Sequence, residues 1–302
     1  MLLSVITCRK EVPQLSVQRR SIGYAILAAA LYALSAPLSK QLLASVSATM
    51  MAALLYLGAG LGMCAVRLGQ RALNTPRREQ SLARADLPYV AGMVALDIAA
   101  PIFLMLGLSR TTAANASLLN NFEIVATSII ALFVFGEAIS RRLWAAIGLI
   151  TLASILLSVE GTESLSFSAG SLLVLLACVC WGFENNCTRR LSEKDPLEIV
   201  TVKGLGSGLG ALAIALATGS GIPGVWQIVS ALLLGFVAYG LSILFYVRAQ
   251  RDLGAARTSA YYALSPFIGV GLSFLMGGAA PAPLFFAALA AMAAGAYLAA
   301  RE

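Results

Sequence analysis

The 302-residue sequence contains no histidine. This absence excludes catalysis by a Ser-His or Cys-His pair, metal binding through imidazole and proton relays through imidazole. The five cysteines include no CxxC pair, and most lie in apolar surroundings, so we interpret them as small buried hydrophobic residues. The sequence therefore predicts no metal site and no cofactor.

Two motifs that drive reactions in other membrane proteins are also missing. The sequence has no GxxxxGK[ST] phosphate loop, which excludes an ATP-driven pump acting by itself. It has no GxGD pair for an aspartyl protease either. Together with the missing histidine, this makes an intramembrane enzyme the least favoured class.

Charge is scarce throughout the chain. Only 12% of the residues are charged, 59% are hydrophobic and the mean hydropathy is +0.85. Because a soluble domain carries about a quarter charged residues, this composition indicates an integral membrane protein in contact with the lipid bilayer. The net charge of +7 does not indicate nucleic acid binding, because the basic residues are scattered among short loops.

Ten apolar runs approach the length of about 20 residues that a membrane-spanning helix needs. Their approximate limits are 22–41, 46–66, 88–109, 112–135, 143–159, 169–189, 197–218, 225–247, 258–277 and 282–299. The predicted fold class is therefore an all-α integral membrane protein with ten transmembrane helices.

The basic residues predict how these helices are oriented. With ten spans, successive connecting segments lie on alternate sides of the membrane. Eighteen of the 21 Lys and Arg residues then fall on the side that holds both termini, whereas the other side holds only Lys40 and Arg110. Basic residues accumulate on the cytoplasmic side, so we expect both termini to be cytoplasmic. The expected location is the cell inner (cytoplasmic) membrane, with residues 1–20 as a cytoplasmic extension rather than a signal peptide.

The two halves of the sequence resemble each other. GAGLG at 58–62 matches GSGLG at 206–210 with an offset of 148 residues. TAANASLL at 112–119 matches AARTSAYY at 255–262 with an offset of 143. The glycine spacings are also explained by close packing of helices alone.

Matches in the same order predict two five-helix repeats, at residues 21–160 and 168–300. An odd number of spans in each repeat means that the halves enter the membrane in opposite senses. Inverted repeats are common in secondary transporters, where the substrate site lies at their interface near mid-membrane.

Four ionisable residues lie inside the apolar runs: Asp97, Glu123, Glu184 and Lys203. An unpaired ionisable group at mid-membrane costs about 2.5–3.5 kcal/mol on insertion scales, so it normally faces a cavity or a partner. We therefore regard these four as candidates for substrate binding or coupling, and we expect no catalytic residue.

Glu123 lies about halfway along the fourth run. In a continuous helix Asn120 and Thr127 fall within about 60° of it, while Asn121 points elsewhere. This polar face predicts the lining of a cavity, although a hydrogen-bonded contact between helices would use the same residues. Glu137, at the end of the run beside two arginines, is expected to be structural.

Glu184 lies nearer the cytoplasmic end of the sixth run, next to Asn185 and on one face with Trp181. Lys203 lies at a matching depth in the seventh run, which predicts an ion pair between Glu184 and Lys203. The alternative is that each reaches toward cytoplasmic water, Lys203 along its long stem.

Asp97 lies near the middle of the third run, one turn before Pro101. A proline permits a bend, and a carboxylate there could titrate as a cavity opens and closes. The alternative is a polar contact within the bundle. Pro37, Pro101 and Pro266 mark three runs in which the helix is expected to be interrupted or kinked.

Four aromatic residues are candidates for the walls of a binding site. They are Tyr32, Trp181, Tyr261 and Tyr262. The alternative for the tyrosine pair is a place in the aromatic belt at the membrane interface.

The ten-span plan, FGE at 135–137 before SRRLWAAIGLI, and LSP at 264–266 are similar to the EamA-type branch of the drug/metabolite transporter superfamily. The resemblance covers about residues 20–300. It implies an inverted-repeat carrier with a central cavity that exports small metabolites. One departure is that Glu123 stands in the first half where the second half has Pro266.

These observations predict a secondary transporter, an exporter working by alternating access. Three buried acids against one lysine favour a small zwitterionic or cationic substrate: an amino acid, an amino-acid derivative or an opine-type metallophore. The export direction follows from the resemblance alone. The alternatives are a channel-like facilitator and a multidrug efflux carrier.

Overall fold

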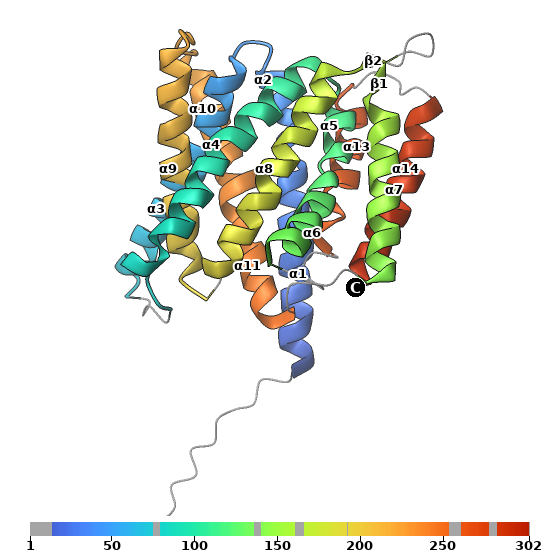
Figure 1. The fold of residues 1–302 in the computed structure, drawn as a ribbon. Coiled ribbons are helices and arrows are strands. Elements are labelled where there is room, and N and C mark those ends of the chain that lie inside the picture. The colour runs from blue at the N-terminus through green and yellow to red at the C-terminus, as the bar shows by residue number, and fades with distance from the viewer. Residues whose placement is uncertain are drawn as a thin grey trace, which may run out of the picture.

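The computed structural model of the chain describes residues 14–74, 79–135, 140–160, 166–191, 193–253, 261–277 and 283–301. The described regular structure is helical apart from one short antiparallel pair, β1 (Val159–Glu160) with β2 (Ser166–Phe167). The helices stand side by side as a bundle, and the hairpin lies at the end opposite the N-terminal end of α1 (Figure 1).

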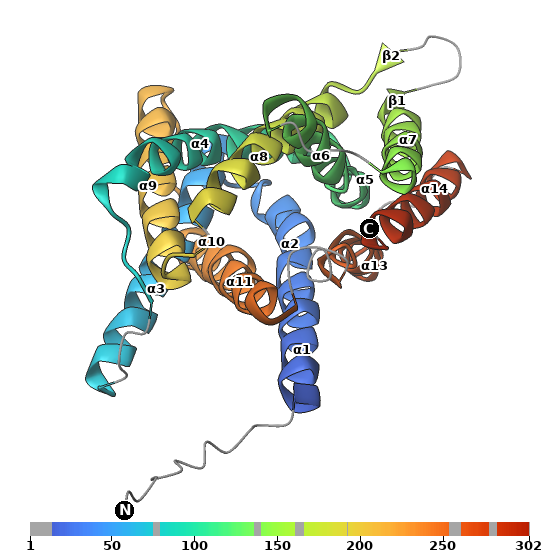
Figure 2. The same cartoon turned by 60° about the horizontal axis from the view of Figure 1, so that its bottom comes forward.

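The first half of the chain contains α1 (Gln14–Ala33), α2 (Ser35–Leu42), α3 (Ala48–Ala72), the short helix η1 (Arg84–Asp86), α4 (Leu87–Arg110), α5 (Ala113–Leu119), α6 (Phe122–Phe135) and α7 (Arg141–Ser158). The second half contains α8 (Ala169–Leu191), α9 (Pro196–Ala217), α10 (Val225–Gly235), the π-helical segment η2 (Phe236–Leu241), α11 (Ser242–Leu253), α13 (Ser265–Leu275) and α14 (Pro283–Ala300). In Figure 2, α7 and α14 form a pair on one side of the bundle, away from α3 and α9.

Seven helical stretches in the described part of the chain are long and apolar enough to cross a membrane. They match seven of the expected runs: 19–42, 48–72, 84–110, 113–134, 169–191, 196–217 and 225–249. The other three runs correspond to α7, α13 and α14, of which α13 and α14 are shorter apolar helices. The all-helical membrane fold is thus confirmed.

Several expected spans are interrupted. The first breaks at Leu34, before Pro37, which has no N–H to donate to the preceding turn. A turn at residues 263–264 likewise precedes α13, which contains Pro266. The expectation of an interruption is wrong for Pro101, because α4 continues through it.

One interruption was not expected from the sequence. The continuous helix predicted over 112–135 is wrong, because α5 ends at Leu119 and α6 begins at Phe122. Asn120 and Asn121 form the turn between them, and asparagine side chains compete with helical hydrogen bonds for backbone groups. This turn and the turn at 263–264 are related by the 143-residue offset of the two halves.

Helices α3 and α9 approach each other through glycines. A Cβ atom added to Gly204 would lie 2.4 Å from the backbone nitrogen of Gly60. One added to Gly60 would lie 2.6 Å from the nitrogen of Leu205, and one added to Gly208 would lie 2.6 Å from the nitrogen of Leu57. Each distance is far shorter than a van der Waals contact, so only glycine permits this backbone approach.

The outer glycines of the two motifs, at GxxxG spacing, pack against other neighbours. An added Cβ at Gly58 would clash with the backbone of α10, and one at Gly206 would press on a side chain of α4. Gly62 and Gly210, one turn further on, would meet side chains of η2 and α4. The packing interpretation is confirmed, but the closest α3–α9 contacts belong to other glycines.

We expect Gly204→Ala to destabilise the protein by about 1–3 kcal/mol, because the added methyl group meets backbone that cannot rotate away. The measurement is thermal unfolding of purified protein in detergent. Gly148→Ala is the matched control, since a Cβ there would have no neighbour within 4 Å. An equal effect of both substitutions would contradict the proposed clash.

An ion pair joins the two halves at the end of the bundle where α1 begins. Arg67 in α3 contacts the carboxylate of Asp195, whose other oxygen accepts a hydrogen bond from the N–H of Leu197 at 2.9 Å and so caps α9. Burial by itself raises the pKa of Asp195. The hydrogen bond and charge of Arg67, together with backbone hydrogen bonds from Leu197 and Glu198, outweigh burial, so the pKa of Asp195 lies below its usual value.

The lowered pKa predicts a pH-dependent stability. A carboxylate with a lowered pKa stabilises the fold fully above its unfolded pKa of about 4, and the contribution is lost as the pH falls below that value. We expect Asp195→Asn, which keeps a capping oxygen, to unfold at a lower temperature than wild type at pH 7. The difference should shrink below about pH 4. A difference independent of pH would contradict the charge-based explanation.

Lys40, one of the two basic residues at the opposite end of the bundle, is bound to the end of a helix. Its Nζ donates to the carbonyl oxygens of Leu108 at 2.6 Å and Thr111 at 2.7 Å. These carbonyls lie at the C-terminus of α4, where a helix carries partial negative charge. This contact explains why Lys40 lies at the end of the bundle where basic residues are otherwise rare.

Candidate functional site

A buried ionic network lies between α4, α8 and α9. Lys203 Nζ contacts Asp97 Oδ2 at 3.0 Å and Glu184 Oε1 at 3.1 Å. The exposed side-chain fractions are 9% for Lys203, 0% for Asp97 and 2% for Glu184. The predicted pair of Glu184 with Lys203 is therefore present, and the alternative in which both residues reach toward water is wrong.

Local structure sets the position of each charged group. Asp195 caps α9 and Pro196 opens it, which places Lys203 two turns inside the helix. Asp97 lies one turn before Pro101 in α4. The network joins an acid from the first half of the chain to an acid and a lysine from the second, a three-way contact that the sequence did not predict.

Neutral donors also contact both carboxylates. Tyr56 OH donates to Asp97 Oδ1 at 3.0 Å, and Trp181 Nε1 donates to the same oxygen at 3.2 Å. Thr188 donates to Glu184 one turn away on α8. Trp181 thus acts as a hydrogen-bond donor in this network. Tyr56 was missed because a single tyrosine in an apolar run carries no signal for its partner.

The charges in this network do not balance. When all three groups are ionised, two carboxylates face one ammonium, which leaves one negative charge in a buried site. An uncompensated buried charge is costly, so the arrangement favours uptake of a proton or of another cation. This chemistry suits either coupling to protons or recognition of a substrate amine.

A second polar cluster surrounds Glu123 in α6. Asn185 Nδ2, from α8, donates to Glu123 Oε1 at 2.6 Å and approaches Thr127 Oγ1 at 3.3 Å. Glu123 and Thr127 therefore share a face, as predicted. Asn120 lies in the turn before α6, and its Oδ1 is buried without a hydrogen-bond partner among the described residues. Asn121 is also buried, with its Nδ2 unpartnered in the same part of the structure.

The stretch GFENN, at residues 182–186, contributes consecutive residues of α8 to both clusters. Successive side chains on a helix are about 100° apart, so adjacent positions face different neighbours. Glu184 faces Lys203, and Asn185 faces Glu123. Asn186 donates back to the carbonyl oxygen of Gly182 at 2.8 Å. The two polar clusters are therefore joined by one turn of α8.

Tyrosine rings extend the site toward α1 and α11. Tyr239 in η2 packs on Tyr56, with ring centroids 5.3 Å apart, and on Tyr32 at 5.7 Å. Tyr262 packs on Tyr32 at 5.7 Å and on Tyr246 at 5.0 Å. Tyr56 belongs both to this row of rings and to the ionic network.

The structure brings two of the three tyrosine candidates into contact with each other. Tyr32 and Tyr262 lie in the row of rings. Tyr261 is half-buried and makes none of these ring contacts in the described part of the chain. Tyr239 was not predicted, since nothing in its sequence context indicates the π-helical turn that carries it. Glu137 lies outside the described residues.

Three comparisons show what the chain is similar to. An "uncharacterized transporter" of Methanothermobacter thermautotrophicus is 27% identical over 277 residues, covering 85% of this chain and 80% of that protein. The "uncharacterized transporter YyaM" of Bacillus subtilis is 25% identical over 185 residues, covering 57% of this chain and 59% of that protein. A solved crystal structure shares the fold with a TM-score of 0.65 and 17% sequence identity, covering 93% of this chain and 96% of that one.

The family model described as "EamA-like transporter family" matches the sequence twice, over residues 19–159 and again over residues 168–301. These two segments include the ionic network, the Glu123 cluster and the row of tyrosines. The chain therefore belongs to the EamA-like transporter family.

Proposed function

We propose that this protein is a secondary transporter that exports a small zwitterionic or cationic metabolite across the inner membrane by alternating access. The proposed substrate class rests on the balance between carboxylates and lysine among the polar side chains of the site. Lys203 contacts two carboxylates, those of Asp97 and Glu184, while a third carboxylate, that of Glu123, accepts a hydrogen bond from Asn185. An amine-bearing molecule such as an amino acid, an amino-acid derivative or an opine-type metallophore fits this balance better than a sugar phosphate.

The architecture proposed for this function is ten spans in two inverted five-helix repeats, at residues 21–160 and 168–300. The contacts of α3 and α9 support it, because the approach of Gly60 to Leu205 and that of Gly208 to Leu57 are related by the 148-residue offset. Gly58, in the first half, packs on α10 of the second half, and the equivalent Gly206 packs on α4 of the first half. This exchange of partners agrees with a two-fold axis that relates the two halves. Two successive matches to one family model point the same way.

In the proposed mechanism, the ionic network responds to a cation. Asp97 belongs to the first half and Glu184 with Lys203 to the second, so the network bridges parts that alternating access moves relative to each other. A proton or a substrate ammonium at the carboxylates would change the attraction between these halves. The relative stability of the outward-open and inward-open states would then depend on whether a proton or an ammonium group is bound to the carboxylates.

Glu123 and Asn185 are proposed to contact the substrate directly. Their hydrogen bond uses one carboxylate oxygen of Glu123, and among the described residues no hydrogen bond is made to the second oxygen, which could accept from an ammonium group. Asn120, whose side-chain oxygen lacks a partner among the described residues, would add a second acceptor from the turn between α5 and α6. Trp181 and the tyrosine rings supply the surrounding aromatic surface.

The experiment that tests the proposed function starts from the growth medium. Metabolites released by a deletion strain and by its complemented parent are compared, and the candidates are tested with purified protein in liposomes. We expect saturable, proton-dependent counterflow. Passage without saturation or counterflow would instead support the channel-like facilitator, and transport of many unrelated cations would support a multidrug efflux carrier.

The proposed topology has both termini and the segment 67–84 in the cytoplasm. Single cysteines introduced in these segments should react with a membrane-impermeant maleimide only after the cells are opened. A cysteine introduced in the loop 160–168 should react in spheroplasts with intact membranes. Labelling of that loop only from the cytoplasmic side would contradict the assignment.

A further inference from the structure

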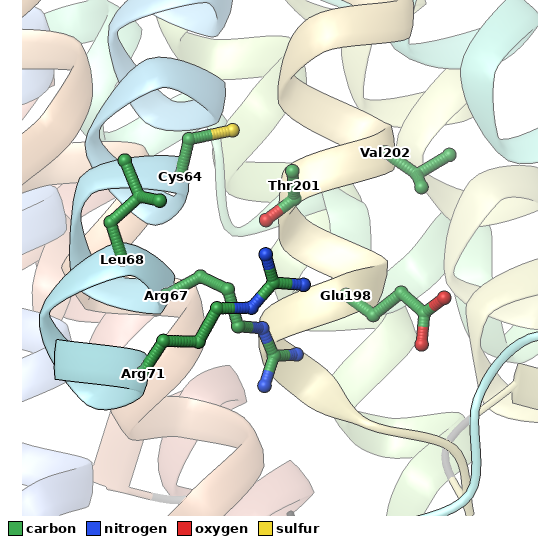
Figure 3. A pocket seen from close by; sticks show the side chains of 7 residues that line it. All are labelled: Cys64, Arg67, Leu68, Arg71, Glu198, Thr201 and Val202. Atoms are coloured by element: carbon green, nitrogen blue, oxygen red, sulfur yellow. The ribbon is translucent and has the colours of Figure 1, made fainter. Parts of the chain in front are cut away.

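A pocket outside the proposed transport site lies between α3 and α9, at the end of the bundle where α1 begins. Its volume is about 360 Å³, and its lining includes Arg67, Leu68 and Arg71 from α3 and Glu198 and Thr201 from α9. Figure 3 shows the two arginine side chains reaching together into the space between these helices. The helix α3 carries them because it continues to Ala72, beyond the end at residue 66 predicted from the sequence.

Two arginines line the pocket, and one of them is already paired. Arg67 is held by the buried carboxylate of Asp195, while Arg71 has no acidic partner among the described residues. The guanidinium group of Arg71, beside that of Arg67, can therefore bind an anion in the pocket. The nearby carboxylate of Glu198 points away from them in Figure 3 and accepts from the N–H of Leu82 at 3.4 Å. An anion that fits a pair of planar forks is a phosphate group.

Beyond the arginines, both helices carry exposed leucines. Leu68 and Leu61 lie two turns apart on α3 and are 63% and 53% exposed, and Leu209 on α9 is 58% exposed. An acyl chain could follow this surface along the helices while its headgroup stays in the pocket. A free phosphate ion would gain nothing from such a surface, so the apolar walls favour a lipid.

We propose that this pocket binds the phosphate headgroup of an anionic membrane lipid, held by Arg67 and Arg71. Basic pockets between transmembrane helices are suited to anionic headgroups. Because α3 and α9 come from opposite halves of the chain, a bound headgroup bridges the halves at this end of the bundle. The lipid therefore stabilises the conformation in which the two helices are arranged as described, independently of which substrate is carried.

The experiment measures lipid binding to the purified full-length protein in detergent. Phosphatidylglycerol, phosphatidylcholine and inorganic phosphate are titrated separately, and binding is followed by the shift in unfolding temperature and by native mass spectrometry. We expect saturable binding of phosphatidylglycerol. Arg71→Gln should weaken it about tenfold, the effect of losing one charge-assisted hydrogen bond. The matched control is Arg84→Gln, which removes an exposed charge outside the pocket.

Three outcomes would overturn the proposal. An equal loss of affinity in Arg71→Gln and Arg84→Gln would mean diffuse attraction to a basic surface. Binding of phosphatidylcholine as tight as that of phosphatidylglycerol would remove the role of net lipid charge. Saturable protection by inorganic phosphate that depends on Arg71, without added lipid, would assign the pocket to a soluble anion. Retained lipid binding in Asp97→Asn would separate this site from the proposed transport function.

Discussion

Replacing Lys203 by alanine is expected to abolish transport and to lower the yield of folded protein. The substitution leaves Asp97 and Glu184 buried together without their shared cation, contacts now made at 3.0 and 3.1 Å. Removing one partner of a buried ion pair costs about 3–5 kcal/mol, because the remaining charge loses its compensation. Thermal unfolding in detergent and uptake by liposomes would measure both effects.

The design that isolates the network uses further substitutions. Lys203→Ala combined with Asp97→Asn and Glu184→Gln should recover much of the lost stability, since no charge is left unpaired. Asp97→Asn alone should fold well, because one carboxylate then faces one ammonium and Asn keeps an oxygen for Tyr56 and Trp181. Strictly additive losses of stability would contradict coupling within the network.

The matched control for Lys203 is a lysine in a weaker pair. Lys194 lies 3.4 Å from Asp86, with side chains that are 20% and 17% exposed. An ion pair near water contributes at most about 1 kcal/mol, so Lys194→Ala should leave the unfolding temperature and the transport rate close to wild type. A loss in Lys194→Ala as large as that in Lys203→Ala would mean that burial is not the decisive difference.

Replacing Glu123 by glutamine is expected to leave the fold intact and to remove most active transport. Gln keeps the volume of the side chain and an oxygen that can accept the hydrogen bond from Asn185, now 2.6 Å long. What it loses is the charge that would bind an ammonium group or carry a proton. A hydrogen bond to a charged group contributes about 1.5–3 kcal/mol, which corresponds to a loss of affinity of about ten- to a hundredfold.

Transport rates measured across a range of pH values test this prediction. Glu193→Gln, at an exposed position, is the matched control and should behave as wild type. If Glu123 only joins α6 to α8, glutamine would serve equally well. A Glu123→Gln protein with the wild-type rate and the wild-type pH dependence would therefore refute a role in binding or coupling.

The polar residues inside the apolar runs were identifiable as a candidate site before the structure was known. An ionisable side chain in a bilayer needs a partner or water, so Asp97, Glu123, Glu184 and Lys203 stand out by composition alone. The depth of Glu184 and Lys203 along their helices also predicted their contact. The role of Asp97 as a second partner of Lys203 could not be predicted, because it depends on how α4 packs against α8 and α9.

The helix breaks and the ring contacts around the site were also only partly predictable from the sequence. Proline removes a backbone hydrogen bond, so the break before Pro37 was predictable, whereas the turn at Asn120 and Asn121 was not. Asparagine tolerates both a helix and a turn, and the choice between them depends on the neighbouring helices. The arrangement of Tyr32, Tyr56 and Tyr239 likewise joins three segments that no periodic pattern connects.

The sequence by itself determined that the chain lies in a membrane as a bundle of helices, because long apolar runs without charge must satisfy their backbone hydrogen bonds internally. It also determined which residues are too polar to face lipid. Only the tertiary structure decided which of these residues meet, since side-chain contacts between helices depend on their rotation, depth and closeness. Gly60, Gly204 and Gly208 set that closeness for α3 and α9.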